Sequence, residues 1–301
     1  MKTCSNLRTK ALAVTFILSL SLSVLAKDDF TLVSGSYQVN VNIKRCVYSV
    51  SKIMYENFPV GADTGFYGTV FDYDNGKMVG TGHAEGGREE LKSVSLTVDG
   101  KEVVPRDGGK YEGGKIILKK TSHIADLLFN SEIELTENGL RETKNFEAVE
   151  NQKVYFLCLF LYCCNVATKE WLAMLPDGQI KEGKFKDDGG WHISNSIKWV
   201  SLYDPASEKG MIFYFPKVVP TPRLPRVTGI WDVKNKYHKL DIFLKLPEII
   251  PKGEKYGPYT LIFKAFSAKS DEWKSESKKL ADCLAAHRTE FSKRENFQPF
   301  R

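Results

Sequence analysis

The sequence lacks the short motifs that identify several large classes of enzymes and cofactor-binding proteins. No pair of cysteines has the doubled Cys-x-x-Cys spacing of a zinc site, and no Gly-x-Ser-x-Gly turn is present to carry a nucleophilic serine. The glycines do not form Gly-x-Gly-x-x-Gly, and no Walker-type lysine follows them. We therefore expect no metal, no other cofactor and no nucleotide phosphate site.

Cysteine and net charge are also scarce. Six cysteines occur in 301 residues, and the five that follow residue 26 are too few and too scattered for a disulfide framework. Cys158, Cys163 and Cys164 fall in the apolar run 154–164, so we expect buried thiols. The chain has 43 Lys and Arg against 37 Asp and Glu, and three of the basic residues precede residue 27, which leaves an excess of three. This excess gives no reason to expect a nucleic acid partner.

Long apolar runs are rare, and the one at the N-terminus has the layout of a secretory signal peptide. Lys2, Arg8 and Lys10 precede apolar residues 11–22, and a stretch suited to signal peptidase ends at Ala26. The alternative is a retained anchor, for which the run is too short. We therefore predict that residues 1–26 are removed and that the mature chain is secreted or periplasmic, without an integral membrane span.

What the sequence does contain is a strong period of two. Apolar and polar residues alternate over 37–44, 93–98 and 240–246, as they do in half-buried strands. Dipeptides that tolerate positive φ separate such runs: Asn75-Gly76, Asp99-Gly100, Asn138-Gly139 and Asp177-Gly178. Short strands joined by hairpin turns predict an all-β protein, an antiparallel two-layer β-sandwich in which residues 27–301 form a single large domain.

Three segments depart from this alternation. Residues 154–164 are apolar on both faces, which predicts a strand buried between two layers. Apolar residues from Trp273 to Phe291 recur at helical spacing, which predicts a C-terminal amphipathic helix over about 271–294. Four prolines between Pro216 and Pro225 exclude a central strand there, and we expect a long surface loop rather than a domain linker.

The densest group of polar residues is Gly80–Glu90. His83, Glu85 and Arg88 lie among glycines directly before a predicted strand, and glycine lets the backbone approach a ligand closely. His83 and Glu85 would share one face of an extended segment and could exchange protons with a substrate. Arg88 could pair with a substrate carboxylate or hydroxyl. The alternative is a polar hairpin loop without a site.

Aromatic and histidine side chains form a second group of candidates. Sugars present both an apolar face and hydroxyls, so their sites combine an aromatic ring with polar groups. The residues that offer this combination, and that we predict to bind substrate beside Arg88, are Trp171, Trp191, His192, Tyr237 and His238. Trp199 and Trp231 are flanked by strand residues and are expected in the core.

Several segments together carry a resemblance to a known family. They are Gly80–Glu90 with the following strand and its Asp99-Gly100 turn, Glu132–Glu150, Ile197–Pro205, Lys209–Phe213 and Tyr237–Leu240. In the pattern of strands and turns over these segments, the chain resembles the galactose mutarotase-like supersandwich of carbohydrate-active proteins. The resemblance implies two layers of long antiparallel strands with a sugar cleft on the concave face.

The resemblance also implies roles for particular residues. Mutarotases of the family use a histidine to protonate the ring oxygen and a late glutamate to take the proton of the anomeric hydroxyl. His83 or His192 matches the histidine. Glu248 and Glu254 flank a proline-rich turn instead of lying on a strand, so the glutamate has no match here.

These observations favour an exported carbohydrate-active protein that binds or processes a sugar or polysaccharide by His/Glu acid–base chemistry. As an enzyme it would be a mutarotase-like epimerase, or a polysaccharide lyase or hydrolase. The alternative is a non-catalytic secreted protein that binds carbohydrate or another surface, and a purely structural secreted protein is the third hypothesis. The sequence leaves open whether the protein is an enzyme.

Overall fold

The structure is a computed structural model that describes residues 28–44, 46–62, 68–81, 89–222 and 228–286. The predicted signal peptide lies outside these residues. The elements in chain order are β1 Asp29–Ser34, β2 Tyr37–Asn42, β3 Ser49–Tyr55, β4 Phe58–Pro59, β5 Gly68–Asp72, β6 Met78–Thr81, β7 Glu90–Val98, β8 Lys101–Val103, β9 Lys110–Glu112, β10 Lys115–Ile124, β11 Leu127–Thr136, β12 Gly139–Ala148, β13 Gln152–Lys153, β14 Phe156–Asn165, β15 Glu170–Met174, β16 Ile180–Lys184, β17 Trp191–Ser194, β18 Trp199–Asp204, β19 Lys209–Tyr214, β20 Gly229–Val233, β21 Tyr237–Leu244, β22 Ile249–Ile250, β23 Lys255–Ser267 and α1 Trp273–Ala286.

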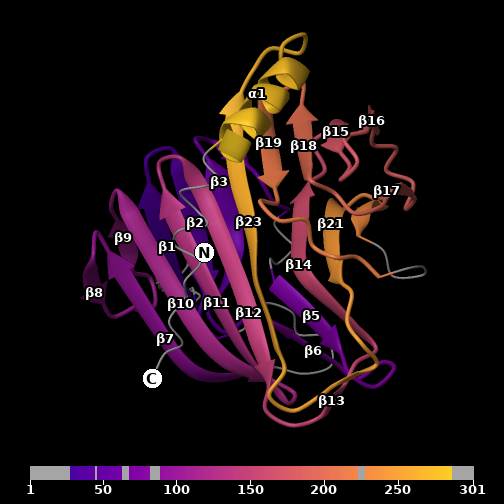
Figure 1. The fold of residues 1–301 in the computed structure, drawn as a ribbon. Coiled ribbons are helices and arrows are strands. Elements are labelled where there is room, and N and C mark those ends of the chain that lie inside the picture. The colour runs from indigo at the N-terminus through magenta and orange to yellow at the C-terminus, as the bar shows by residue number, and fades with distance from the viewer. Residues whose placement is uncertain (1–27, 45, 63–67, 82–88, 223–227, 287–301) are drawn as a thin grey trace, which may run out of the picture.

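The strands form three main sheets and one small one. A ten-stranded sheet has the order β16-β15-β18-β19-β23-β12-β11-β10-β7-β8 (Figure 1). A six-stranded sheet has the order β17-β20-β21-β14-β5-β6, a five-stranded sheet the order β4-β3-β2-β1-β9, and β13 pairs with β22. Neighbouring strands are antiparallel except for β1 and β9, which are parallel. The predicted all-β antiparallel sandwich is confirmed.

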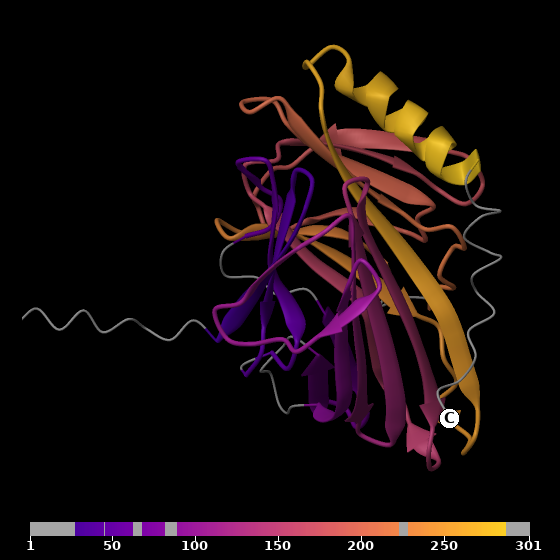
Figure 2. The same cartoon turned by 90° about the vertical axis from the view of Figure 1, so that its left-hand side faces the viewer.

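The five- and six-stranded sheets both pack against the ten-stranded sheet. The Tyr37 hydroxyl of β2 donates to the Ala265 carbonyl oxygen of β23 at 3.3 Å. The Tyr162 hydroxyl of β14 donates to Glu142 of β12 at 2.8 Å. Figure 2 shows the indigo strands of the five-stranded sheet on the side of the ten-stranded sheet away from α1. The main core therefore lies between the ten-stranded layer and the other two sheets.

Helix α1 packs on the outer face of the ten-stranded sheet. The Trp273 ring stacks on Tyr203 of β18 at 5.0 Å between centroids, and both residues are buried. The predicted C-terminal helix is confirmed over 273–286, and residues 287–294 of that prediction lie outside the described residues. Within the part of the chain that the structure describes, no helix has the length and apolar character needed to cross a membrane.

The strands and turns follow the sequence pattern closely. Strand β14 is buried on both faces from Phe156 to Cys164, as its unbroken apolar run predicts. The turn from β7 to β8 places Asp99 at φ 49° and Gly100 at φ 80°, the positive angles that a type I′ hairpin requires. Three cysteines of β14, Cys158, Cys163 and Cys164, are buried as predicted.

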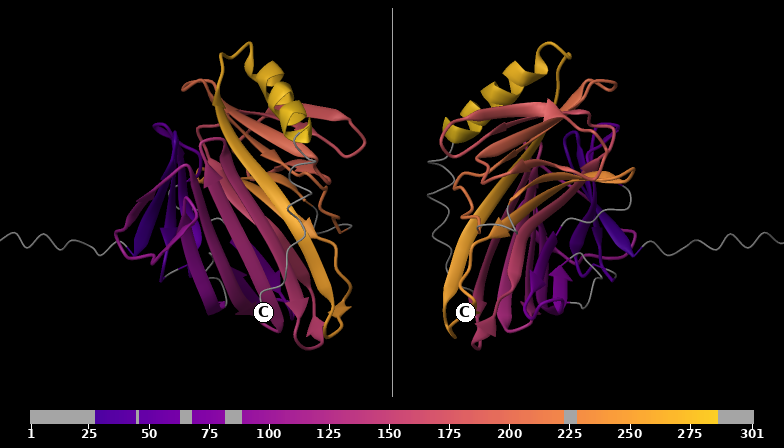
Figure 3. Two further views of the ribbon diagram at one scale, coloured as in Figure 1. Left: turned by 60° about the vertical axis from the view of Figure 1, so that its left-hand side comes forward. Right: turned by 90° about the vertical axis from the view of Figure 1, so that its right-hand side faces the viewer.

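Strand β23 is the longest in the structure and joins two halves of the ten-stranded sheet. It pairs with β12 on one side and β19 on the other, so it lies between the group β12, β11, β10, β7 and β8 and the group β19, β18, β15 and β16. Figure 3 shows it running most of the length of the molecule. The last strand that the structure describes therefore occupies a central position in the largest sheet.

Candidate functional site

The glycine-rich candidates lie outside the described residues, which stop at Thr81 and resume at Glu89. These residues are His83, Glu85 and Arg88, and their predicted roles stay predictions. Glu89 itself is buried between the layers, where Lys120 Nζ lies 2.6 Å from its Oε1 atom. Ser122 Oγ donates to the other carboxylate oxygen at 2.5 Å. This ion pair anchors the chain at the point where the glycine-rich segment ends.

A second buried ion pair lies beside the first. Lys144 Nζ is 2.9 Å from Glu142 Oε1 and donates to the Leu159 carbonyl oxygen at 2.9 Å. Burial lowers the pKa of Lys120, an effect that the Glu89 carboxylate opposes. Lys120, Glu142 and Lys144 line a small interior cavity of about 20 Å³, too small for a sugar. We assign these charges to holding the layers together.

Four of the described candidates lie on β17 (Trp191, His192) and β21 (Tyr237, His238), which flank β20 in the six-stranded sheet, and Trp171 lies on β15 of the ten-stranded sheet. Side chains along a strand alternate between the two faces of a sheet. Leu240 and Ile242 point into the main core, so Lys239 and Asp241 lie on the outer face. Trp191 pairs with Trp231, and Trp231 pairs with Lys239, which places the three side chains in one row across that face.

This row forms a surface that we call the tryptophan platform: Trp191, Trp231, Lys239 and Asp241. The Trp191 and Trp231 rings stack at 5.7 Å between centroids and 24° between planes. Lys239 follows Trp231 in the row, and its Nζ atom lies 5.3 Å from the Trp231 ring centroid. Trp191 keeps 49% of its surface exposed, so a flat aromatic area faces outward.

Asp241 supplies the carboxylate of the platform. The Trp231 indole nitrogen donates to Asp241 Oδ2 at 2.8 Å, and Lys239 Nζ lies 3.9 Å from Oδ1. Burial lowers the pKa of Lys239, but the Asp241 carboxylate together with neighbouring thiol and phenol groups holds that pKa above its ordinary value. The platform therefore combines an aromatic ring, a fixed positive charge and a buried carboxylate, the groups that recognise a sugar.

The local sequence makes room for this arrangement. Gly229 begins β20 beneath the exposed indole. A Cβ atom there would lie 1.9 Å from the Ile193 carbonyl oxygen and 3.0 Å from the Trp191 ring. Only glycine permits this approach of β20 to β17, so Gly229 brings the two tryptophans within stacking distance.

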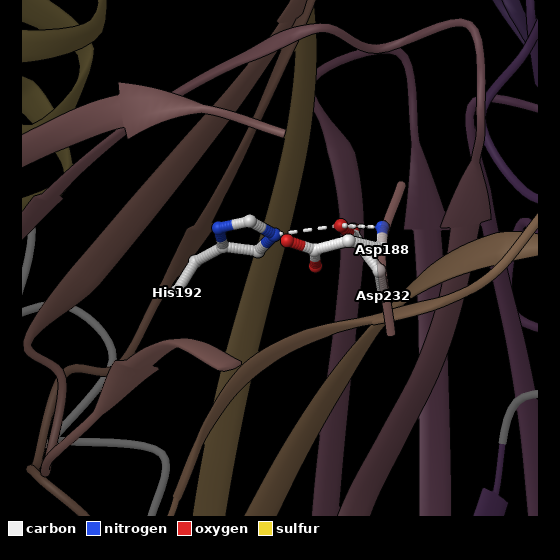
Figure 4. Close-up of side chains that lie close together, drawn as sticks. All are labelled: Asp188, His192 and Asp232. Atoms are coloured by element: carbon white, nitrogen blue, oxygen red, sulfur yellow. Dashed lines mark hydrogen bonds and ion pairs between the residues drawn. The ribbon is translucent and has the colours of Figure 1, made fainter. Parts of the chain in front are cut away.

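The opposite face of the same strands carries a different cluster, which we call the Asp232 cluster. Asp232 is buried and its two carboxylate oxygens accept from two histidines, His192 Nε2 at 2.8 Å and His238 Nδ1 at 2.7 Å. The backbone amides of Asp187 and Asp188 also donate to Oδ2, at 2.7 and 3.4 Å. Figure 4 shows Asp188 and Asp232 converging on the His192 ring.

Aromatic rings enclose these histidines. Phe185 stacks on His238 at 3.6 Å between centroids and meets His192 edge-on at 5.1 Å. The Trp171 ring, also buried, lies 6.4 Å from His192. His238 is 1% exposed, and its Nε2 atom contacts the Thr168 carbonyl oxygen at 2.9 Å. Burial lowers the pKa of His238, although the Asp232 carboxylate favours the charged ring.

The Asp232 cluster includes the described residues that come nearest to a metal-ligand set. One ligand atom each from Asp188, His192 and Asp232 lie within 4.8 Å of one another. However, four hydrogen bonds already reach the Asp232 carboxylate, three of them at Oδ2. A carboxylate so fully engaged suits a hydrogen-bonded anchor for β17 and β21 better than a metal ligand.

The structure thus divides the predicted substrate-binding residues between two faces. Trp191 lies on the outer face, and Tyr237 lies on the same side at the start of β21. Trp171, His192 and His238 lie together between the layers around Asp232. Trp199 is in the core as predicted, whereas Trp231 is half-buried on the outer face, so its prediction as a core residue was wrong.

Sequence reasoning missed Lys239, Asp241 and Asp232. The alternation of the strand at 240–246 contained a signal, because a charged residue between inward-facing Leu240 and Ile242 must point outward. The burial of Asp241 had no such signal. Groups from both neighbouring strands reach the carboxylate: Trp231 Nε1 from β20 at 2.8 Å and Cys158 Sγ from β14 at 3.8 Å.

No family model and no curated protein matches the chain, but solved structures do. A putative aldose 1-epimerase from Klebsiella pneumoniae subsp. pneumoniae MGH 78578 is similar at 12% identity and a TM-score of 0.51, over 82% of this chain and 80% of that one. A putative aldose 1-epimerase from Escherichia coli K12 has 11% identity and a TM-score of 0.45, over 80% and 99%. A GH36 α-galactosidase from Geobacillus stearothermophilus has 12% identity and a TM-score of 0.45, over 80% and 41%.

At such identities a likeness concerns the fold alone. The similarity to the Klebsiella structure confirms the predicted resemblance: the chain has the fold of galactose mutarotase-like proteins. The two-layer arrangement with a single described helix agrees with it.

Proposed function

We propose that the protein is an exported carbohydrate-active protein and that the tryptophan platform binds its sugar. The observation that carries the proposal is the half-exposed Trp191 ring, stacked on Trp231 beside Lys239 and Asp241. A sugar ring presents C–H groups that pack on an indole and hydroxyls that need hydrogen-bonding partners at its edge. The mutarotase-like fold, shared with proteins named for sugar chemistry, supports the same substrate class.

In this proposal the glycine-rich segment supplies the proton transfers. The segment follows β6, which forms the edge of the six-stranded sheet opposite to β17 of the platform. His83 would donate a proton to the sugar and Glu85 would accept one, with Arg88 holding a substrate carboxylate or hydroxyl. Export rests on the N-terminal signal pattern. The non-catalytic alternative is the same surface binding a sugar without turning it over.

Tryptophan fluorescence gives a direct test, because the proposed site contains two indoles. The full mature chain is titrated with monosaccharides and short oligosaccharides, and interconversion of anomers is followed by polarimetry. We expect a saturable fluorescence change in the wild type. Trp191→Ala should weaken binding at least tenfold through lost stacking, and Trp191→Phe should retain most of it. No saturable response to any sugar would refute the proposal.

A matched control and a second variant separate binding from catalysis. Ile249→Ala removes an exposed apolar side chain, 58% exposed, from the small β13–β22 sheet and should leave binding unchanged. His83→Ala should keep the fluorescence response and lose turnover. If wild type and His83→Ala both bind and neither turns sugar over, the non-catalytic alternative is correct.

A further inference from the structure

Two rows of polar side chains cross the outer face of the ten-stranded sheet. The strand registers align the first row as Ser93, Thr121, Asn130 and Asn145. They align the second row as Ser95, Lys119, Glu132 and Thr143. We call the two rows together the polar ladder. The residues that alternate with them, such as Leu96, Leu118 and Phe129, are buried in the main core, so the polar ladder faces away from it.

Hydrogen bonds between strands hold the first row in place. Thr121 Oγ1 donates to Asn130 Oδ1 at 2.7 Å, and Asn130 Nδ2 donates to Asn145 Oδ1 at 3.0 Å. The chain of bonds ends at Asn145, whose Nδ2 group has no partner among the residues that the structure describes. An ordered amide with unused hydrogens is a ready donor to a ligand hydroxyl.

A cavity of about 750 Å³ lies over this face. Its lining includes side chains of the polar ladder and extends to Lys255, Gly257 and Pro258 of β23. The lining comes from β7, β10, β11, β12 and β23, which at about 4.8 Å per strand spans roughly 19 Å. The volume and length suit a ligand of several linked rings.

The charges in the cavity are balanced. Lys119 Nζ lies 3.2 Å from Glu132 Oε2, and Lys255 Nζ lies 3.3 Å from Glu147 Oε2. Each cation is paired with a carboxylate, so the cavity presents no net field to attract a phosphate or a polyanion. Amides and hydroxyls remain as recognition groups, and these fit an uncharged polyhydroxylated ligand.

We propose that the polar ladder is a second carbohydrate site, which binds a neutral oligosaccharide chain laid across β7, β10, β11, β12 and β23. It lies on the opposite side of the sandwich from the tryptophan platform and shares no residue with it. The proposal therefore goes beyond the proposed function and stands or falls separately from it.

Calorimetric titration of the full mature chain tests the site. The probes are cello-, malto-, xylo- and galacto-oligosaccharides of two to six residues, with oligogalacturonate as the charged comparison. We expect one series of neutral probes to bind with an affinity that rises with chain length, and oligogalacturonate to bind more weakly. Absence of heat with every neutral probe, or tighter binding of the charged one, would overturn the proposal.

Variants locate the binding. Asn145→Ala should weaken it about tenfold, as expected for a lost ligand hydrogen bond. Ser95→Trp should block the cavity and abolish it. The matched control is Asn138→Ala, an exposed asparagine in the β11–β12 turn, which should leave the affinity unchanged.

The two proposed sites are separated by crossing the variants. Trp191→Ala should weaken the binding seen by fluorescence at least tenfold and leave the calorimetric affinity for the long probe intact. If Trp191→Ala removes the calorimetric signal while Asn145→Ala and Ser95→Trp do not, the oligosaccharide binds at the tryptophan platform and the polar ladder is no site.

Discussion

The tryptophan platform and the Asp232 cluster lie on opposite faces of the same three strands and use the same kinds of group. Each has a buried carboxylate that accepts from an aromatic N–H: Asp241 from Trp231, and Asp232 from His192 and His238. They differ in what remains free. Four hydrogen bonds reach Asp232 and rings enclose its histidines, whereas Trp191 is half-exposed beside Asp241. The fully hydrogen-bonded groups of the Asp232 cluster therefore stabilise the fold, whereas the exposed Trp191 ring has a surface that a ligand can contact.

The largest effect that would test this comparison is the loss of the buried carboxylate. Asp232→Ala removes all four hydrogen bonds and leaves two buried histidines without their partner. We expect the free energy of unfolding to fall by about 4 kcal/mol, the usual size of breaking a buried charged network. Urea denaturation followed by circular dichroism measures the change.

The control for Asp232→Ala comes from the same loop. Asp188 is exposed and lies close to His192 and Asp232. Asp188→Ala should lower the free energy of unfolding by less than about 1 kcal/mol, because exposed charges contribute little. Equal losses for the two variants would mean that the two aspartates act together, as ligands of one ion would.

A smaller effect is expected on the other face. Trp191→Ala removes one stacked ring pair and part of an exposed indole, so we expect a loss of about 1 kcal/mol. Trp199→Ala, in the core, should cost about 4 kcal/mol. Thermal unfolding of both variants gives the ratio of the two losses in the free energy of unfolding. A Trp191 variant as destabilised as the Trp199 variant would show that the platform is structural.

The smallest effect concerns acid. Burial raises the pKa of Asp232, but the hydrogen bonds and charges of His192 and His238 together hold that pKa below its ordinary value. As the pH falls, the Asp232 carboxylate is therefore protonated at a higher pH in the unfolded chain than in the folded protein. The stability that Asp232 contributes is complete above its unfolded pKa of about 3.9 and is lost as the pH falls through the folded pKa.

The measurement is the urea midpoint between pH 5 and pH 2.5. Asp232→Asn removes the titrating group and should flatten the dependence of the midpoint on pH relative to the wild type. Other carboxylates titrate in both proteins, so only the difference between them reports on Asp232. If the urea midpoint of Asp232→Asn depends on pH as steeply as that of the wild type, Asp232 does not contribute to the acid dependence of stability.

The sequence was sufficient for the architecture because a period of two, broken by turn dipeptides, belongs to half-buried antiparallel strands. It was not sufficient for the candidate site. Trp191 and His192 are adjacent, and the sequence placed both in one cleft, whereas strand β17 sends them to different faces. The partners that decide their roles, Trp231 and Asp232, come from β20, some forty residues later in the chain. Pairing between distant strands leaves no local pattern to find.

The central position of β23 sets the order in which the protein can be assembled. Because its residues are synthesised after every other described strand, β12 and β19 each keep an unpaired edge until Lys255–Ser267 has emerged from the ribosome. The ten-stranded sheet is therefore closed only after its nine other strands have been synthesised. A product truncated before Lys255 would retain two open edges able to pair with another copy of itself.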